Sequence, residues 1–251
     1  MLSIIFPLWQ DSWRIAHAAQ GVTRLRAALP YPIEVVAVDD GSTDDTAEAA
    51  ERAGFYVVRQ PHRGRGAAIR AGMLAANGVY RMLIDPAWTV SPEQVQLLLP
   101  PVLHGFDLAI ASRNLPGSTR KGEPLLREQS SRLVARLVQA VVLPGISDVH
   151  SGLICVRAEA ARTLFSRSRE DGGAVEVEVL ALARAFGLEV REVPVDWQVS
   201  ASQSGPKGPP IRQAPELVAG LARVRARLAT GAYPPLRMDP PVTEAAPRTF
   251  A

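Results

Sequence analysis

Short apolar runs rich in β-branched residues alternate with longer segments of helical spacing in the first half of this 251-residue chain. The apolar runs predict buried strands over residues 2–8, 33–38, 55–58, 80–84 and 107–111. The segments between them predict helices over residues 12–29, 43–53, 65–77 and 91–103. This alternation is typical of an α/β fold with a mainly parallel central sheet flanked by helices. Ligands of such sheets bind beyond the carboxyl ends of the strands, so we expect one rim to gather Pro7–Asp11, Asp39–Ser42 and Asp85–Thr89.

The second half of the chain has fewer strand signals. It predicts a basic amphipathic helix over 124–142, a helix over 175–187, an alternating strand over 188–197 and a last helix over 214–229. With 47% hydrophobic residues the chain can bury one large core, and we expect a single domain over 1–230. Segment 231–251 is rich in proline and has no periodicity, which predicts a disordered tail.

Charge and cysteine content exclude several classes of protein. The 28 basic and 25 acidic side chains give a net charge of +3, too mild to indicate a nucleic-acid-binding protein. The single cysteine, Cys155, excludes an intrachain disulfide and fits a reducing compartment. The first nine residues are too short for a signal peptide, and no apolar run approaches the roughly 20 residues of a membrane span. We expect a cytoplasmic protein that is soluble or peripheral on the inner face of a membrane; the sequence does not determine its oligomeric state.

The stretch VAVDDGSTDDT, residues 36–46, is the most informative part of the sequence. An apolar strand delivers Asp39 and Asp40 to its carboxyl end, where carboxylates can accept hydrogen bonds from a base or a ribose. Gly41 allows a ligand to approach the backbone closely. Thr43 and Asp44 fit equally well as residues that cap the following helix. Two adjacent aspartates at a buried strand end are costly without partners, which favours a binding role for Asp39 and Asp40.

Together with three further motifs, this stretch resembles the inverting glycosyltransferases of family 2, which have the GT-A fold, and most closely the polyprenyl- and dolichyl-phosphate sugar transferases. The family's Asp-Asp-Gly-Ser-Thr-Asp element is matched in full by Asp39–Asp44. Looser matches are Pro7–Ser12 for the Pro-x-x-Asn-Glu-Glu element, Gly64–Ala68 for the glycine loop and Ala111–Arg113 for the Gly-Ser-Arg element. The resemblance extends from residue 2 to about residue 230.

The resemblance implies a donor site for a nucleotide-diphosphate sugar. It places Pro7, Asp11, Asp39, Asp40 and Gly41 at the base and ribose, and Asp85 at the diphosphate. Arg65, in the glycine loop Gly64–Ala68, either contacts a phosphate directly or belongs to a loop that only packs tightly. The loop follows the third strand and not the first, so it does not indicate a dinucleotide-binding fold.

For the acceptor, the resemblance implies a polyprenyl phosphate held by Arg113, Arg127 and Ser131. Arg127 and Ser131 are four residues apart, which places them on one face of the predicted helix. A guanidinium group can bind a phosphate with two parallel hydrogen bonds. The alternative for Arg127 is a solvated basic face.

Residues 147–157 resemble the family's Asp-Thr-Gln-Cys-Gly-Phe-Lys element. Asp148 is a candidate to orient an acceptor or to act as a general base, and His150 is a candidate to titrate near neutral pH, bind an acceptor or metal, or serve the structure alone. Glu176 and Glu178 resemble an acidic pair at a helix start. Because they are two residues apart, we expect at most one of them to face the site.

The metal ligands expected from the resemblance are missing. Ala87 and Thr89 stand where metal-dependent members have an aspartate and a glutamine, so only Asp85 is left for weak binding of Mg²⁺ or Mn²⁺. Alternatively, Arg65, Arg113 or Lys207 neutralises the leaving diphosphate. We therefore predict an inverting transferase with weak or no metal dependence and a polyprenyl phosphate acceptor. Its alternatives are transfer to a hydroxyl with Asp148 as base, or an inactive nucleotide-sugar-binding relative.

Overall fold

A seven-stranded sheet with the strand order β3-β2-β1-β4-β7-β5-β8 forms the centre of the protein. The structure is a computed structural model that describes residues 1–88, 90–100, 102–122, 125–149, 151–198 and 214–234. The strands of the central sheet are β1 (Leu2–Leu8), β2 (Ile33–Asp40), β3 (Tyr56–Gln60), β4 (Tyr80–Leu83), β5 (Leu108–Ser112), β7 (Ile154–Arg157) and β8 (Val190–Pro194). All neighbours pair in parallel except β7, which is antiparallel to both β4 and β5. This confirms the predicted mainly parallel α/β sheet.

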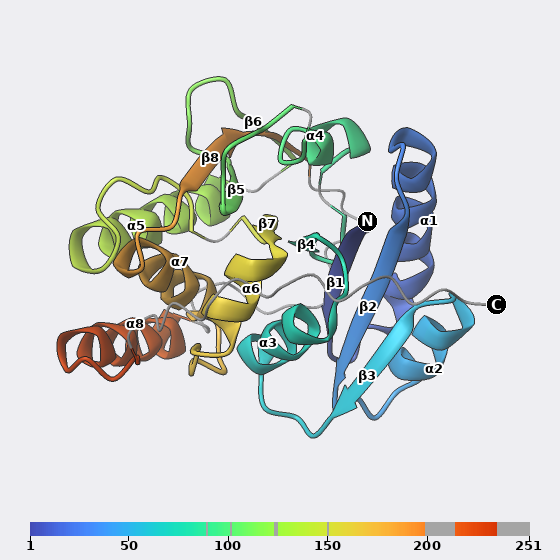
Figure 1. Cartoon of the computed structure of the whole chain (residues 1–251), viewed down its shortest axis with the longest axis horizontal. Helices are drawn as coiled ribbons and strands as arrows, with labels where there is room; N and C mark the ends of the chain where they lie inside the picture. The colour runs from blue at the N-terminus through green and yellow to red at the C-terminus, as the bar shows by residue number, and fades with distance from the viewer. Residues whose placement is uncertain (89, 101, 123–124, 150, 199–213, 235–251) are drawn as a thin grey trace, which may run out of the picture.

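Helices cover both faces of this sheet (Figure 1). They are α1 (Ser12–Ala28), α2 (Thr46–Arg52), α3 (Arg65–Ala75), α4 (Pro92–Gln96), α5 (Leu125–Val141), α6 (Ala158–Phe165), α7 (Val175–Ala185) and α8 (Ala214–Ala229). Side chains alternate along β1, so Ile4 and Phe6 pack with α1 and α2, whereas Ile5 packs with α3, α6 and α7. Among the described residues, no helix has both the length and the apolarity needed to cross a bilayer.

Several predicted boundaries are wrong for local reasons. The second helix begins at Thr46 and not at residue 43, because the Asp44 carboxylate accepts the Thr46 backbone N–H at 3.2 Å and holds the preceding residues in a turn. The helix expected over 91–103 is only α4, which ends at Gln96. The strand expected over 188–197 splits into β8 and β9 (Asp196–Gln198), because β9 leaves the main sheet to pair with β6 (Thr119–Lys121).

Three elements, β6, β7 and α6, were not predicted. Both β7 and α6 lie in residues 154–165, where a short apolar run leads directly into a helix without a turn signal. Packing also continues past residue 230: Tyr233, which the sequence placed in the tail, is 8% exposed. The rest of the predicted tail, residues 235–251, lies outside the described residues.

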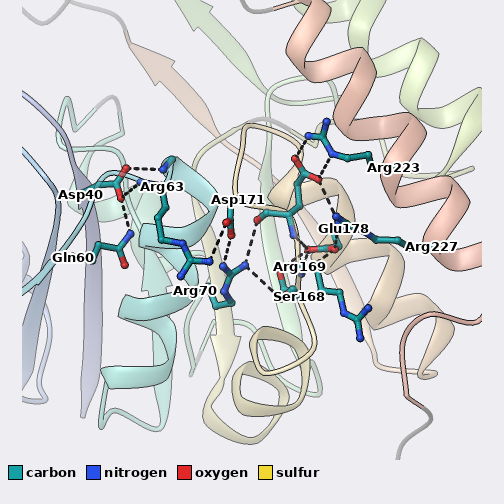
Figure 2. Close-up of polar contacts among 12 residues, drawn as sticks. Asp40, Gln60, Arg63, Arg70, Ser168, Arg169, Asp171, Glu178, Arg223 and Arg227 are labelled. Atoms are coloured by element: carbon teal, nitrogen blue, oxygen red, sulfur yellow. Dashed lines mark hydrogen bonds and ion pairs between the residues drawn. The ribbon is translucent and has the colours of Figure 1, made fainter.

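The buried carboxylate of Glu178 joins α8 and Tyr233 to the domain. Figure 2 shows Glu178 beside Arg169 and Arg227. Glu178 in α7 is fully buried and accepts hydrogen bonds from the backbone N–H groups of Arg169 and Glu170 at 2.9 Å. It also accepts the Tyr233 hydroxyl at 2.6 Å and the Arg227 guanidinium at 3.4 Å. Such a carboxylate is held by donors from three separate segments, so it stabilises the C-terminal packing and does not face the predicted site.

We expect Glu178→Gln to lower the free energy of unfolding by about 2–4 kcal/mol, because the new amide turns an N–H₂ group toward buried donors. Urea unfolding monitored by circular dichroism measures this. The matched control is Glu189→Gln, which removes an ion pair with Arg191 whose side chains are both more than half exposed and costs at most about 1 kcal/mol. Equal unfolding free energies of the two variants would contradict the anchoring role.

Candidate functional site

The predicted rim exists at the carboxyl ends of β1, β2, β4 and β5. Because β7 runs antiparallel, the segment before it, which contains Asp148 and Gly152, reaches the same edge. The start of α7 arrives there as well, since Glu176 contacts Arg65. The rim therefore brings together side chains that lie far apart in the sequence.

Asp40 holds the loop that follows β3. Its carboxylate is 2% exposed and accepts the backbone N–H groups of Arg63 at 3.0 Å and Gly64 at 2.8 Å. It also accepts the Gln60 amide at 2.6 Å, and the His62 ring nitrogen Nδ1 lies 2.9 Å from Oδ2. Figure 2 shows the Gln60 side chain directed at Asp40, whereas the Arg63 side chain extends from this contact toward Asp171. The hydrogen-bond donors that a buried aspartate needs are thus supplied to Asp40 by the loop after β3, without a ligand.

Asp39 and Gly41 differ from Asp40 in their surroundings. Asp39 is 5% exposed and accepts the Ser42 backbone N–H at 3.3 Å through Oδ1. Gly41 has a φ of 72°, and a Cβ atom there would lie 2.6 Å from the His62 backbone nitrogen. Close approach of the chain to itself therefore accounts for this glycine, and Asp39 is the better candidate for ligand contact.

The loop after β1 is bonded to the Asp39–Asp44 element. The backbone N–H of Gln10, which has a φ of 52°, donates to the Ser42 hydroxyl at 3.0 Å, and the Asp11 N–H donates to the Thr46 hydroxyl at 2.8 Å. Pro7 lies within β1 opposite Val38 of β2, beyond the last residue that pairs with β4, so its missing N–H breaks no bond on that side. Two predicted donor-site segments thus form one connected surface.

Asp85 lies in a turn directly after β4. Its Oδ1 atom accepts the Ala87 N–H at 2.8 Å, and its backbone carbonyl accepts the Trp88 N–H at 2.9 Å. Trp88 has a φ of 49°, and its ring packs so closely on Gly21 of α1 that a Cβ atom there would lie 2.3 Å away. The turn that carries Asp85 is therefore fixed by packing against α1.

Arg14 is a site residue that the sequence did not reveal. It is 4% exposed, and its Nη1 atom lies 3.4 Å from Oδ1 of Asp11 and 3.7 Å from Oδ1 of Asp85. The sequence could have indicated its burial, because Arg14 lies at helical spacing from Ala18, Gly21 and Leu25 on the buried stripe of α1. An arginine at such a position needs an anionic partner.

Tight packing of the glycine loop is confirmed for its two glycines, whereas direct contact of Arg65 with a phosphate stays a prediction. Gly64 and Gly66 pack against the loop at Asp171, whose carbonyl oxygen accepts the Gly66 N–H at 2.7 Å. The start of α3 is therefore occupied by protein. The Arg65 side chain instead pairs with the buried Glu176.

Arg65 also lies near Asp85. Burial alone would lower the pKa of its guanidinium, but the carboxylates of Glu176 and Asp85 raise that pKa above its usual value. A Cβ atom on Gly152 would lie 3.9 Å from Cβ of Asp85 and 4.0 Å from Nη2 of Arg65. Arg65, Asp85 and Gly152 thus come together from three different parts of the chain.

Arg113 and Asp148 form a buried pair. The carboxylate of Asp148, 2% exposed, accepts Nε of Arg113 at 2.7 Å, Nη2 at 3.0 Å and the Arg113 backbone N–H at 3.0 Å. The guanidinium stacks 5.0 Å from the ring centre of Trp197. This pair fixes the orientation of Arg113, and it holds both oxygens of Asp148 in hydrogen bonds.

The remaining predicted acceptor residues have no described side chains. The helix that carries Arg127 and Ser131 is confirmed as α5, and the two residues lie about one turn apart along it. His150, Thr89 and Lys207 lie outside the described residues. The pair Glu176 and Glu178 divides as expected: the first contacts Arg65 at the rim and the second lies in the C-terminal anchor.

The described residues do not form a metal centre. Position 87 offers only a methyl group, which is 8% exposed, and the Asp85 carboxylate beside it already contacts an N–H group and Arg14. Among the residues the structure describes, no group of three His, Cys, Asp or Glu side chains is placed to hold an ion. Of the motif expected to hold Mg²⁺ or Mn²⁺, the described residues supply only the Asp85 carboxylate, which is a poor fit to the oxygen-rich sites that these ions prefer.

An exposed aromatic pair at the rim was also missed. Trp9 is 52% exposed and stacks on His62 with ring centres 4.7 Å apart and an angle of 24° between the planes. The feature of the sequence that could have indicated this pair is the tryptophan inside the loosely matched Pro7–Ser12 motif. A flat apolar surface of this kind suits a nucleobase.

Comparison with known proteins agrees with this geometry. The family described as "Glycosyl transferase family 2" matches residues 3–165. The dolichyl-phosphate beta-glucosyltransferase of Dictyostelium discoideum is 24% identical over 256 residues, covering 92% of this chain and 76% of that protein. The Homo sapiens dolichyl-phosphate beta-glucosyltransferase is 27% identical over 256 residues, covering 92% and 77%.

Solved structures share the fold. Glucosyl-3-phosphoglycerate synthase from Mycobacterium tuberculosis, in complex with Mn²⁺, uridine diphosphate and glucosyl-3-phosphoglycerate, aligns with a TM-score of 0.68 at 20% identity, covering 90% of this chain and 80% of that one. Mannosyl-3-phosphoglycerate synthase from Rubrobacter xylanophilus aligns with a TM-score of 0.69 at 18% identity, covering 97% and 78%. These neighbours confirm the predicted GT-A fold.

We expect Asp40→Ala to lower the free energy of unfolding by about 2–3 kcal/mol, because two backbone N–H groups and the Gln60 amide lose their acceptor. Asp45→Ala is the matched control: Asp45 is exposed, its side chain caps no N–H, and its loss costs about 0.5 kcal/mol. Urea unfolding gives both values, and hydrogen exchange should show faster exchange of the Arg63 and Gly64 amides in the Asp40 variant only. Unchanged exchange there would contradict the role of Asp40 in holding the loop.

Proposed function

The chain belongs to glycosyl transferase family 2 and is a glycosyltransferase, and from this premise we propose that it transfers a sugar from a nucleotide-diphosphate donor to a polyprenyl phosphate. The observation that carries the proposal is the meeting of Arg65 and Asp85 beside Gly152 at the carboxyl edge of the sheet. Gly152, which has a φ of 68°, lies next to both side chains, and in open α/β sheets this edge is where ligands bind.

The donor lies along the rim from β2 to β4. Asp39 and Asp11 accept hydrogen bonds from the base and ribose, and the exposed Trp9 ring provides a flat surface for the base. The diphosphate then reaches the region of Asp85, where Arg65 offers a guanidinium group that stays protonated at neutral pH. The support for this order is the connected surface formed by the loops after β1 and β2.

The acceptor side uses Arg113 together with Arg127 and Ser131 of α5. Arg113 is held rigidly by Asp148 and Trp197, and a preorganised guanidinium loses little freedom when it binds a phosphate. The dolichyl-phosphate enzymes among the relatives are consistent with a phosphate acceptor. Leu133 of α5 is 67% exposed, so it does not cover the core and is available to a membrane surface beside the acceptor.

The chemistry needs no general base. A polyprenyl phosphate is anionic at pH 7, and one of its oxygens attacks the anomeric carbon directly. The bond from that carbon to the donor diphosphate breaks, its electron pair leaves with the nucleoside diphosphate, and a single displacement inverts the configuration. Transfer to a hydroxyl would need a base to accept a proton. Asp148 suits that role less well, because Arg113 engages both of its oxygens.

A direct test measures transfer from a panel of UDP- and GDP-sugars to a short polyprenyl phosphate and to the matching polyprenol. We expect transfer to the phosphate alone, with inverted configuration in the product. Transfer to the alcohol would support the hydroxyl alternative with Asp148 as base. Donor binding without transfer to either acceptor would contradict the proposal and favour a nucleotide-sugar-binding relative.

We expect Arg127→Ala to weaken use of the polyprenyl phosphate at least tenfold while nucleotide affinity stays within about threefold, since one phosphate contact of a guanidinium contributes more than about 1.4 kcal/mol. The matched control is Arg132→Ala on the same helix, which removes only an exposed ion pair with Glu128. Steady-state kinetics and calorimetry give the two quantities. Equal effects of the two variants would count against a phosphate site on α5.

A further inference from the structure

Arg14 is buried at the donor site in an arrangement that fold stability alone does not explain. Its ion-pair distances to Asp11 and Asp85, 3.4 Å and 3.7 Å, are contacts between charges and not good hydrogen bonds. Its Nε and Nη1 atoms are buried and have no hydrogen-bond partner among the described residues. A buried ion pair of this quality is often no more stabilising than apolar residues of similar volume.

The position of Arg14 is unusual in a second respect. Asp11 follows β1 and Asp85 follows β4, so one guanidinium contacts carboxylates from two neighbouring strand ends. The ring of Trp13 lies 4.6 Å from the guanidinium carbon and covers one of its faces. The Asp85 side chain above it is 33% exposed, whereas the Arg14 side chain is 5% exposed. The carboxylate thus faces the site and the cation lies beneath it.

We propose that Arg14 is a positioning residue of the donor site: a permanent internal cation that compensates Asp11 and Asp85 and allows a nucleoside diphosphate to bind without a divalent ion. The inference rests on the proposed donor site. Arg14 acts through the two carboxylates and does not touch the ligand. It accounts for Ala87, since a site that contains its own cation does not need the second carboxylate that would hold a metal.

Counting charges shows why this cation matters. In the ion pairs between described residues, three carboxylates, those of Asp11, Asp85 and Glu176, meet two guanidinium groups, those of Arg14 and Arg65, a balance of one negative charge. Without Arg14 the same cluster would have two. At the low effective dielectric of a partly buried site, one added charge within a few ångströms changes the affinity for a diphosphate by tenfold or more. A divalent ion could supply the same positive charge, so the test compares binding with and without one.

The test is calorimetry of inorganic diphosphate and of UDP and GDP, each measured with a chelator and with Mn²⁺, on the full chain. For the wild type we expect affinities that agree within about threefold between the two conditions. Arg14→Met should bind at least tenfold more weakly in chelator, and Mn²⁺ should restore most of the loss by replacing the missing charge. Arg14→Lys, which keeps the charge, should stay closer to the wild type than Arg14→Met does. Arg24→Met, an exposed position on the same helix, is the matched control and should change nothing.

Several outcomes would overturn the inference. The wild type could need Mn²⁺ for tight binding, or bind no diphosphate in either condition. The Arg14→Met protein could bind diphosphate in chelator with the same affinity as the wild type. Equal loss in both conditions would show a purely structural role. If Arg14→Met does not fold, the wild-type metal response and Arg14→Lys decide the matter. Failure of the proposed function has a different signature: metal-independent binding of diphosphate as expected, with no sugar transfer from any donor.

Discussion

The parallel pairing of β1 with β2 on one side and β4 on the other is the constraint on which the site depends. The register joins Leu8 to Asp39 and Ile5 to Leu83, so Asp39 at the end of β2 and the loops that carry Asp11 and Asp85 lie at one edge of the sheet. Side chains alternate across this strand into two separate cores, and a shift by one residue would exchange the faces of all of them. The hydrophobic effect thereby fixes the positions of the polar groups at the rim.

Charged groups at the rim are nearly all held by partners from distant segments. Asp40 holds the loop at residues 62–64, Asp148 holds Arg113, and Glu176 holds Arg65. A single buried charge is costly, and breaking one such pair leaves the other charge uncompensated. The same pairing preorganises the site, because guanidinium groups that are already oriented lose little freedom when an anion arrives.

The turn at Asp85 links the fold to the question of the metal. Trp88 fixes the turn by packing on Gly21, and Arg14, which lies on the same buried stripe of α1, contacts the Asp85 carboxylate. In the Mn²⁺ complex of the Mycobacterium tuberculosis synthase, an ion accompanies the uridine diphosphate. Here the chain has alanine at position 87 and a buried arginine next to its remaining aspartate. In the proposed donor site the charge of Arg14 and a divalent ion serve the same purpose, which is the reason to measure their effects together.

The sequence by itself determined the order of the strands and helices from β1 to β5, the mainly parallel sheet and the rim that gathers Asp11, Asp39 and Asp85. These follow from hydrophobic period and from turn residues, which are signals within windows of a few to about 18 residues. Because Glu176 and Glu178 are two residues apart on a helix, their division between the rim and the core could be predicted as well. The roles predicted for Arg127, Ser131 and His150 stay predictions.

Only the tertiary structure decided which charges are already paired. Arg113 meets Asp148 across 35 residues of sequence and Arg65 meets Glu176 across 111, and neither spacing has a local signal. The antiparallel course of β7, which brings Asp148 and Gly152 to the rim, was equally hidden in a short apolar run. Arg14 was read as part of a helix and proved to lie beneath two carboxylates. The physical reason is the same in each case. Hydrophobic periodicity depends on residues that are near in sequence, whereas strand direction and ionic partners depend on the packing of the whole domain.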